Sequence, residues 1–211
     1  MKKKYLKLVA CLALVAAITT GLTLAYLSVN TGTVTNNFTS KQKINGTTTE
    51  PKWTKKHPDS TWKDYLPGEM TEKDPQVTID AGSARANVAL KVSFFVENEQ
   101  VTYSEFAADY ADVYTVTSKE VAEEGFSTAW TKVAASEMKD TKDLFFVYND
   151  VVDATTAAKT TSTLFDFVKV DSDLKTTPSF KIVITGYAVQ ADNLTGTTAT
   201  AELVKLAELN K

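Results

Sequence analysis

Few side chains in this sequence are of the types that carry out enzyme chemistry. Acidic residues lie close together at three places, which are Glu123 with Glu124, Asp109 with Asp112, and Asp171-Ser172-Asp173. Paired carboxylates can bind calcium or act as general acid and base, but the spacing of an EF-hand loop is absent. Because Asp-Ser-Asp is typical of a turn, we assign it no catalytic role, and we name no catalytic residue or metal ligand among the three groups.

Nucleophilic and zinc chemistry lack their usual residues. The sequence has one cysteine, Cys11, and one histidine, His57, and it contains no His-Glu-x-x-His motif. His57 precedes Pro58 in a stretch without regular period, so we expect it in a solvated loop. With neither a nucleophile–base pair nor a metal-binding motif, we predict a protein that is not an enzyme and that uses no cofactor.

Three aromatic residues stand among lysines and prolines in the stretch 46–74. They are Trp53, Trp62 and Tyr65. Aromatic residues interleaved with basic ones can stack on nucleic-acid bases or on sugars. They can also fix a loop to the rest of a domain, and this interpretation stays open beside a surface site. We therefore treat the three residues as candidate surface aromatics.

The first 25 residues have the pattern of an export signal. Four lysines lie between residues 2 and 7, and the 17 residues from Leu8 to Leu24 carry no charge. Ala25 is a small residue that would allow a peptidase to cut before Tyr26. The alternative is a permanent membrane anchor, but a spanning helix requires roughly 20 apolar residues. We expect the signal helix to meet the membrane only before cleavage, and the product to be secreted.

Two parts of the sequence carry a family resemblance. The first combines Gly21-x-Thr23-x-Ala25-Tyr26-Leu27 with Thr33-Val34-Thr35-Asn36-Asn37-Phe38-Thr39. The second combines Pro67-Gly68-Glu69, Lys73-Asp74-Pro75, Val77-Thr78-Ile79 and Ala81-Gly82-Ser83. Together they resemble the SipW-dependent exported proteins of Gram-positive bacteria, which include TasA-like and camelysin-like proteins. The resemblance implies processing by a SipW-type signal peptidase, a jelly-roll-like sandwich, and a role as a fibre-forming matrix protein or a surface protease.

The charge of the chain restricts its partners. After removal of the signal, 186 residues remain with 19 basic and 26 acidic side chains, a net charge of about −7. An acidic surface disfavours nucleic acid and anionic lipid as partners. The remaining chain also has no cysteine, so its stability must come from packing and strand pairing.

The hydrophobic pattern after residue 75 is that of an all-β domain. The alternating row Val88, Leu90, Val92, Phe94 and Val96 predicts a core strand, and 76–80 alternates in the same way. Further strands are expected at 113–117, 126–134, 144–152, 164–170 and 180–189, with a polar connector at 155–163. A short helix is expected near Tyr103 with Ser104 as its cap. A C-terminal helix is expected over 197–209, with Leu203, Leu206 and Leu209 covering one end of the sandwich.

These elements predict an all-β fold, an antiparallel jelly-roll-like β-sandwich with a short C-terminal helix, preceded by a cleavable signal helix. The expected organisation is a signal peptide at 1–25, an N-terminal arm or first strand at 26–45, a polar loop or extension at 46–74, and the β-sandwich domain at 75–211.

The arm has its own apolar pattern. Val34, Phe38 and Ile44 share one side of an extended strand, which could pair within its own sheet or join the sheet of a neighbouring subunit. We therefore expect a secreted cell-surface or biofilm-matrix protein that associates with itself or with other surface proteins. The alternatives are a camelysin-like secreted protease and a monomeric adhesin or carbohydrate-binding module.

The mature protein is expected to begin at Tyr26. N-terminal sequencing of the protein recovered from culture medium would test the predicted cleavage directly. A secreted product that still begins with the lysine-rich head would contradict a removable signal.

Overall fold

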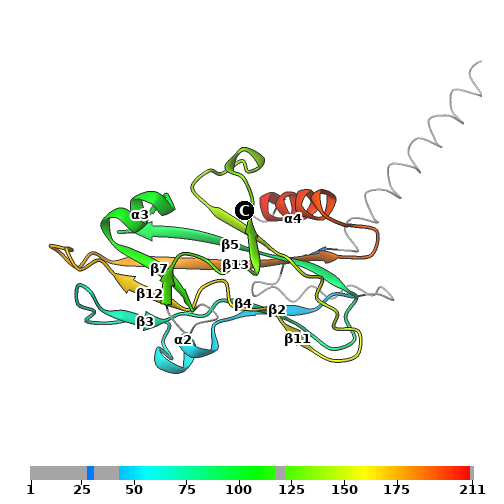
Figure 1. Cartoon of the computed structure of the whole chain (residues 1–211), viewed down its shortest axis with the longest axis horizontal. Helices are drawn as coiled ribbons and strands as arrows, with labels where there is room; N and C mark the ends of the chain where they lie inside the picture. Colours follow the sequence, from blue (N-terminus) through cyan, green and yellow to red (C-terminus); the bar gives the residue numbers. More distant parts are fainter. Residues whose placement is uncertain (1–27, 31–42, 117–121, 210–211) are drawn as a thin grey trace, which may run out of the picture.

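A six-stranded antiparallel sheet forms one layer of the molecule (Figure 1). This computed structural model describes residues 28–30, 43–116 and 122–209. The centre of the sheet is β5 (Ala86–Val96), which pairs with β13 (Phe180–Gln190) along the whole length of both strands. The remaining strands are β1 (Ser28–Asn30) beside β13, β6 (Glu99–Val101) and β10 (Leu144–Tyr148) beside β5, and β9 (Trp130–Lys132) beside β10.

The second layer consists of two short sheets joined end to end. One contains β2 (Gly46–Thr49), β4 (Gln76–Ile79) and β11 (Lys159–Thr160), and the other contains β3 (Met70–Glu72), β12 (Phe167–Val170), β7 (Ala111–Val116) and β8 (Ala122–Glu124). Backbone hydrogen bonds from Lys73 to Asp166 (3.0 Å) and from Leu164 to Pro75 (2.9 Å) continue the pairing between them. The two layers together make the sandwich-like, antiparallel, all-β architecture that the sequence predicts.

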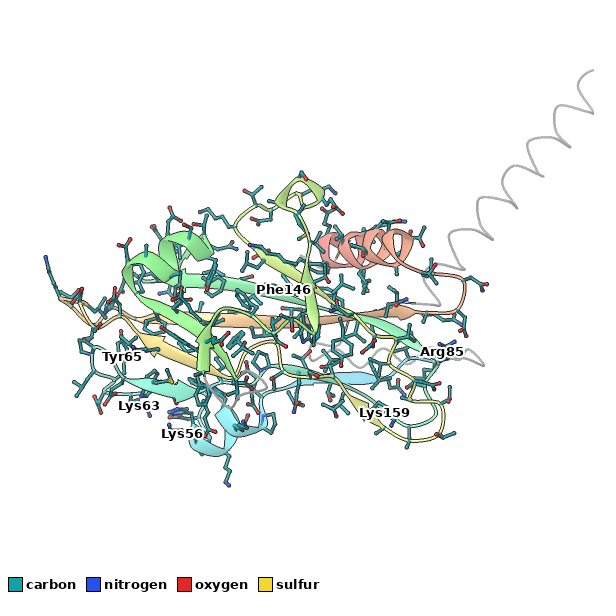
Figure 2. The ribbon with its side chains drawn as sticks, in the orientation of Figure 1. Lys56, Lys63, Tyr65, Arg85, Phe146 and Lys159 are labelled. Atoms are coloured by element: carbon teal, nitrogen blue, oxygen red, sulfur yellow. The ribbon has the colours of Figure 1, made fainter. Side chains whose placement is uncertain are left out.

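The core between the layers follows from the alternation along β5. Val88, Leu90, Val92 and Phe94 are fully buried, as predicted, because side chains two apart on a strand share one face. They pack against residues of the second layer, among them Val77, Ile79, Val113, Leu164 and Phe165. Phe146 of β10 lies in the same interior, which Figure 2 shows at the middle of the molecule.

Helix α4 (Thr197–Leu209) has the predicted bounds but a different position and buried face. It lies on the outer face of the six-stranded sheet, where Leu203, Val204 and Ala207 pack with Ala89, Phe145 and Tyr187. Leu209 is 73% exposed, so the predicted stripe of leucines at three-residue spacing is wrong at its end. A helix turns once in 3.6 residues, so spacings of four keep side chains on one face better than repeated spacings of three.

Helix α3 (Tyr103–Asp109) is present near the predicted place but begins one residue before the predicted cap. Thr102, not Ser104, is the N-cap, and it forms a capping box with Glu105. The Thr102 side chain accepts from the backbone of Glu105, and the Glu105 carboxylate accepts from the backbone of Thr102. Phe106 is the buried residue of this helix.

The sequence suggested a polar loop or extension at 46–74, but this stretch contains regular elements. It contains β2, the helix α2 (Pro51–Lys56) and β3. The sequences of β2 and β3 have little apolar character, and these strands are held in place by pairing with β4 and β12. The predicted connector 155–163 likewise contains β11, and the strands expected at 126–134, 144–152 and 164–170 are shorter than predicted.

Part of the expected N-terminal organisation lies outside the described residues. The signal segment with Ala25 and Tyr26, and the arm residues Val34 and Phe38, belong to that part. Among the helices that the structure describes, none has the length and apolar character needed to cross a bilayer.

The alternation of β5 gives a matched pair of stability tests. Phe94 is fully buried, with its ring 4.8 Å from that of Phe106, whereas the neighbouring Phe95 points to the other face and is half-buried. Phe94→Ala is expected to lower the free energy of unfolding by about 3–5 kcal/mol, because it leaves a cavity in the core. Phe95→Ala is expected to cost clearly less. Urea unfolding followed by circular dichroism would compare them, and equal losses would contradict the assigned faces.

Candidate functional site

A groove of about 640 Å³ lies between the α2 region and the beginning of β13. Its walls carry Trp53 of α2, Trp62 and Tyr65 of the following segment, and Phe180 and Ile182 of β13. Figure 2 shows Tyr65 toward the end of the molecule where β12 connects to β13. The three candidate surface aromatics of the sequence are thus brought together in one site.

The aromatic rings follow one another along the groove. The ring of Trp53 lies 4.3 Å from that of His57, and His57 lies 6.2 Å from Trp62. Trp62 is 5.6 Å from Tyr65, and Tyr65 is 5.2 Å from Phe180. Successive rings are tilted by between 39° and 60°, so they form a curved wall and not a flat stack.

The same row of rings continues into the core. Phe180 lies 5.4 Å from Phe106, and Phe106 lies 4.8 Å from Phe94 of β5. In addition, the Tyr65 hydroxyl donates a hydrogen bond to the backbone carbonyl of Pro178. The wall of the groove is therefore fixed to the sandwich and does not depend on the 57–69 segment alone.

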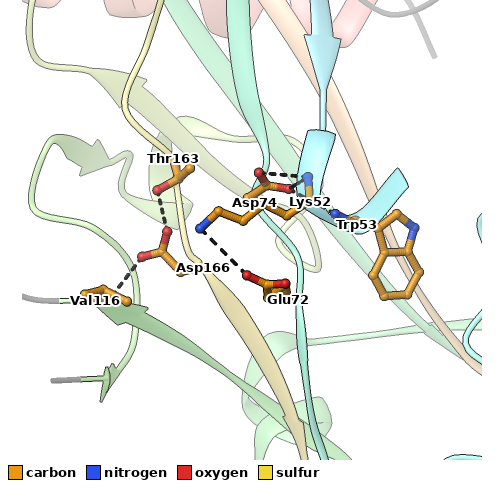
Figure 3. A network of polar contacts seen from close by, with 7 residues as sticks. All are labelled: Lys52, Trp53, Glu72, Asp74, Val116, Thr163 and Asp166. Carbon is orange, nitrogen blue, oxygen red and sulfur yellow. Dashed lines mark hydrogen bonds and ion pairs between the residues drawn. The ribbon is translucent and has the colours of Figure 1, made fainter. Parts of the chain in front are cut away.

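A buried aspartate positions α2. The side chain of Glu50, the N-cap residue of α2, makes no capping hydrogen bond. The Asp74 carboxylate takes this place, accepting from the backbone of Lys52 (3.0 and 3.2 Å) and of Trp53 (3.3 Å), as Figure 3 shows. Asp74 is 2% exposed, so a negative charge sits against the positive end of the helix, away from water. This contact holds the backbone of Trp53 in the first turn of the helix.

A buried ion pair lies in the floor of the groove. Lys73 Nζ lies 2.7 Å from Glu50 Oε1 and 2.8 Å from Oε2, and only 7% of the lysine side chain is exposed. The same ammonium lies 4.6 Å from the centre of the Trp53 ring, a distance suited to a cation–π contact. Removing one member of a buried pair typically costs about 3–5 kcal/mol, so the two charges hold each other in place.

His57 is not in the lining of the groove but packs behind it, between the rings of Trp53 and Trp62, and it is not the solvated loop residue that the sequence suggested. It ends α2, where its backbone N–H donates to the carbonyl of Trp53. Its Nε2 lies 2.9 Å from the Thr71 hydroxyl, which belongs to the buried side of β3. Burial, helped by the nearby ammonium of Lys56, lowers the pKa of the His57 imidazole from its ordinary value.

Next to the groove, one edge of the six-stranded sheet has no partner among the strands that the structure describes. β1 pairs only with Tyr187–Val189 of β13, and no described strand pairs with that edge between Phe180 and Gly186. Backbone bonds from Ala191 to Arg85 and from Glu97 to Ser179 show that odd-numbered residues of β13 face β5. Because the direction alternates, Phe180, Ile182, Ile184 and Gly186 direct their backbone groups toward the open edge.

The other predicted site residues are not in the groove. Ile44, expected with Val34 and Phe38 in an N-terminal arm or first strand, is 3% exposed and belongs to the core of its own chain. Sequence reasoning missed Phe180 and the Glu50–Lys73 pair, which join the site only through the folding of distant segments.

Comparison with protein-family models, curated proteins and solved structures gives no match for this chain. The resemblance to SipW-dependent exported proteins therefore rests on the sequence motifs alone. No cluster of three or more His, Cys, Asp or Glu side chains suited to a metal ion occurs within 28–30, 43–116 and 122–209. The geometry of the described site offers aromatic faces, hydroxyl and charged groups, and open backbone positions.

The single histidine gives a direct test of this environment. We expect His57 to titrate below its ordinary value of about 6.5 in a proton NMR experiment, because burial and Lys56 both disfavour its charged form. Since the folded state holds the proton less tightly than the unfolded state, His57 should reduce stability as the pH falls below about 6.5.

Substitutions of two neighbouring lysines distinguish the effect of the Lys56 charge on the His57 pKa from the effect of burial. Lys56→Gln should raise the pKa of His57 toward its ordinary value, because it removes a nearby positive charge. Lys55→Gln, which removes a charge from the adjacent position of the same helix, should leave it nearly unchanged. An ordinary titration in the wild-type protein would contradict the buried placement.

Proposed function

We propose that this protein is an exported cell-surface or matrix structural protein that assembles with further copies by strand addition. The acceptor in this proposal is the open edge of β13 between Phe180 and Gly186. The proposal joins the export pattern of the sequence with a site that offers backbone groups for pairing. It includes processing by a SipW-type signal peptidase, which rests on the family resemblance.

The observation that carries the proposal is the length of the open edge. An edge strand with unpaired N–H and C=O groups is a template for another extended chain. Each backbone hydrogen bond contributes roughly 0.5–1.5 kcal/mol net, so pairing along Phe180–Gly186 supplies several contributions at once. Natural sheets usually protect such an edge with charges or proline. Here Lys181 is the one charged residue in this part of β13, and the apolar Val183 is 40% exposed.

The proposed donor is the N-terminal arm of a neighbouring copy. In its own chain, β1 runs antiparallel to β13, with Ser28 opposite Val189 and Asn30 opposite Tyr187. An arm from a neighbouring copy, added in this same antiparallel orientation, would run along the open edge toward Phe180. The sequence after Asn30 contains Val34 and Phe38, which can occupy one face of an added strand. Ile44 is not part of this donor, because it is buried in its own domain.

Proline substitutions at the two edges of the sheet test the acceptor. Ile184→Pro removes a backbone N–H that faces the open edge of β13, and proline is tolerated in an edge strand at such a position. Lys132→Pro is the matched control, because the backbone bond from Val133 to Phe145 means that Lys132 faces outward on the opposite edge strand, β9. Ile184→Pro is expected to abolish assembly, whereas Lys132→Pro should leave it intact.

The measurement is negative-stain microscopy together with light scattering of the secreted protein over a range of concentrations. Val183→Lys provides a second variant that keeps the backbone and places a charge on the same strand. Both β13 variants should remain folded by circular dichroism and stay monomeric. Assembly of Ile184→Pro to the wild-type extent would refute the acceptor, and a wild-type protein that stays monomeric at every concentration would refute strand addition.

A further inference from the structure

We propose that the aromatic groove is a binding site for an uncharged saccharide. This inference is separate from strand addition, because it concerns the side chains of the groove and not the backbone edge. Its volume of about 640 Å³ falls within the range of about 300–1,000 Å³ that is usual for small-ligand sites. Trp62 and Tyr65 are the central residues of the proposal.

The aromatic wall provides the apolar surface that a sugar ring requires. Trp53, Trp62, Tyr65 and Phe180 are all only partly buried, so each presents part of its ring outward. Trp53 has the Lys73 ammonium at 4.6 Å and the His57 ring at 4.3 Å, whereas the rings nearest to Trp62 and Tyr65 lie at 5.6 and 5.2 Å, so we take Trp62 and Tyr65 as the platforms. A pyranose ring has C–H groups on its faces, and these pack well on an aromatic ring. The tilt of 51° between the two rings suits successive sugar units that turn relative to each other.

The charges of the groove favour a neutral ligand. Its lining contains two acidic residues, Glu50 and Asp64, and two basic residues, Lys73 and Lys181. Glu50 and Lys73 form an ion pair in the lining, so their charges offset each other. An anion such as a nucleic-acid phosphate has no basic cluster here, and a cationic ligand finds only the single carboxylate of Asp64 outside the Glu50–Lys73 pair.

Hydroxyl and carboxylate groups complete the site. Ser60, Thr61, Asp64 and Ser179 stand in the lining beside the aromatic platforms. Each sugar hydroxyl is both a donor and an acceptor, and these side chains offer both functions. The groove thus combines apolar ring faces with polar groups. A sugar ring has apolar faces and polar hydroxyl groups at its edge, so the two surfaces match. Because the wall is fixed through Phe180 and Phe106 to the core, little ordering is needed on binding.

The test is an NMR titration of the mature protein with uncharged hexasaccharides of glucose and of N-acetylglucosamine. The ring protons of His57 are the reporter, since His57 lies between Trp53 and Trp62 and is the only histidine. At least one of these saccharides is expected to shift the His57 signals in a saturable manner. Polygalacturonate and a proline-rich peptide serve as anionic and peptide comparisons.

Substitutions of Trp62 test whether the saccharide binds on its ring. Trp62→Ala should weaken binding by about tenfold or more, and Trp62→Phe, which keeps a ring, should retain most of it. Tyr114→Ala is the control, because Tyr114 is a partly buried aromatic residue of β7 that is absent from the lining. Calorimetry supplies the affinities, and circular dichroism confirms that each variant is folded.

Three results would overturn the inference. They are no binding of either saccharide at millimolar concentration, equal binding by Trp62→Ala and wild type, or binding of the peptide or the anionic polymer alone. Repeating the titration on Ile184→Pro separates this site from assembly, because Ile184 is not in the lining. Saccharide binding by that variant would support the groove even if strand addition failed.

Discussion

The unbroken pairing of β5 with β13 is the constraint on which the rest of the molecule depends. Eleven residue pairs, from Phe180 opposite Val96 to Gln190 opposite Ala86, keep one register without a bulge. That register places Val88, Leu90, Val92 and Phe94 in the core and Ala89 beneath α4 on the other face. A shift of one residue would exchange the two faces, so both the sandwich and the packing of α4 require this pairing.

The same strand pair also creates the site at the end of the sheet. β13 extends beyond the three residues that β1 covers, so its first half has a backbone edge with no described partner. Its first residue, Phe180, is where the aromatic groove meets the core, through contacts to Tyr65 and to Phe106. The groove and the edge therefore both follow from the length of β13, of which the described part of β1 covers only three residues on that side.

Much of the sandwich can be predicted from the alternation of apolar and other residues, because apolar residues at every second position of β5 indicate a buried face. The stretch 46–74 could not be predicted in this way, since its elements are stabilised from outside. Asp74 caps a helix that begins more than 20 residues earlier in the chain, and Lys73 is buried because Glu50 neutralises it. Charged residues normally indicate exposed positions. Only the folded arrangement shows that Asp74 has a backbone partner in α2 and that Lys73 has Glu50 as its partner. The aromatic residues of the site were visible in the sequence, but their partner Phe180 lies more than 110 residues away.

The two proposed interactions share part of one strand, and this makes them thermodynamically linked. Phe180 and Ile182 line the groove and also direct their backbone groups to the open edge. A strand added at this edge places its own side chains beside the groove, where they meet the same aromatic surface as a bound saccharide. Any change in saccharide affinity caused by assembly must then be matched by an equal change in assembly caused by saccharide. The sign of this coupling depends on the side chains that the added strand presents next to Tyr65 and Trp62.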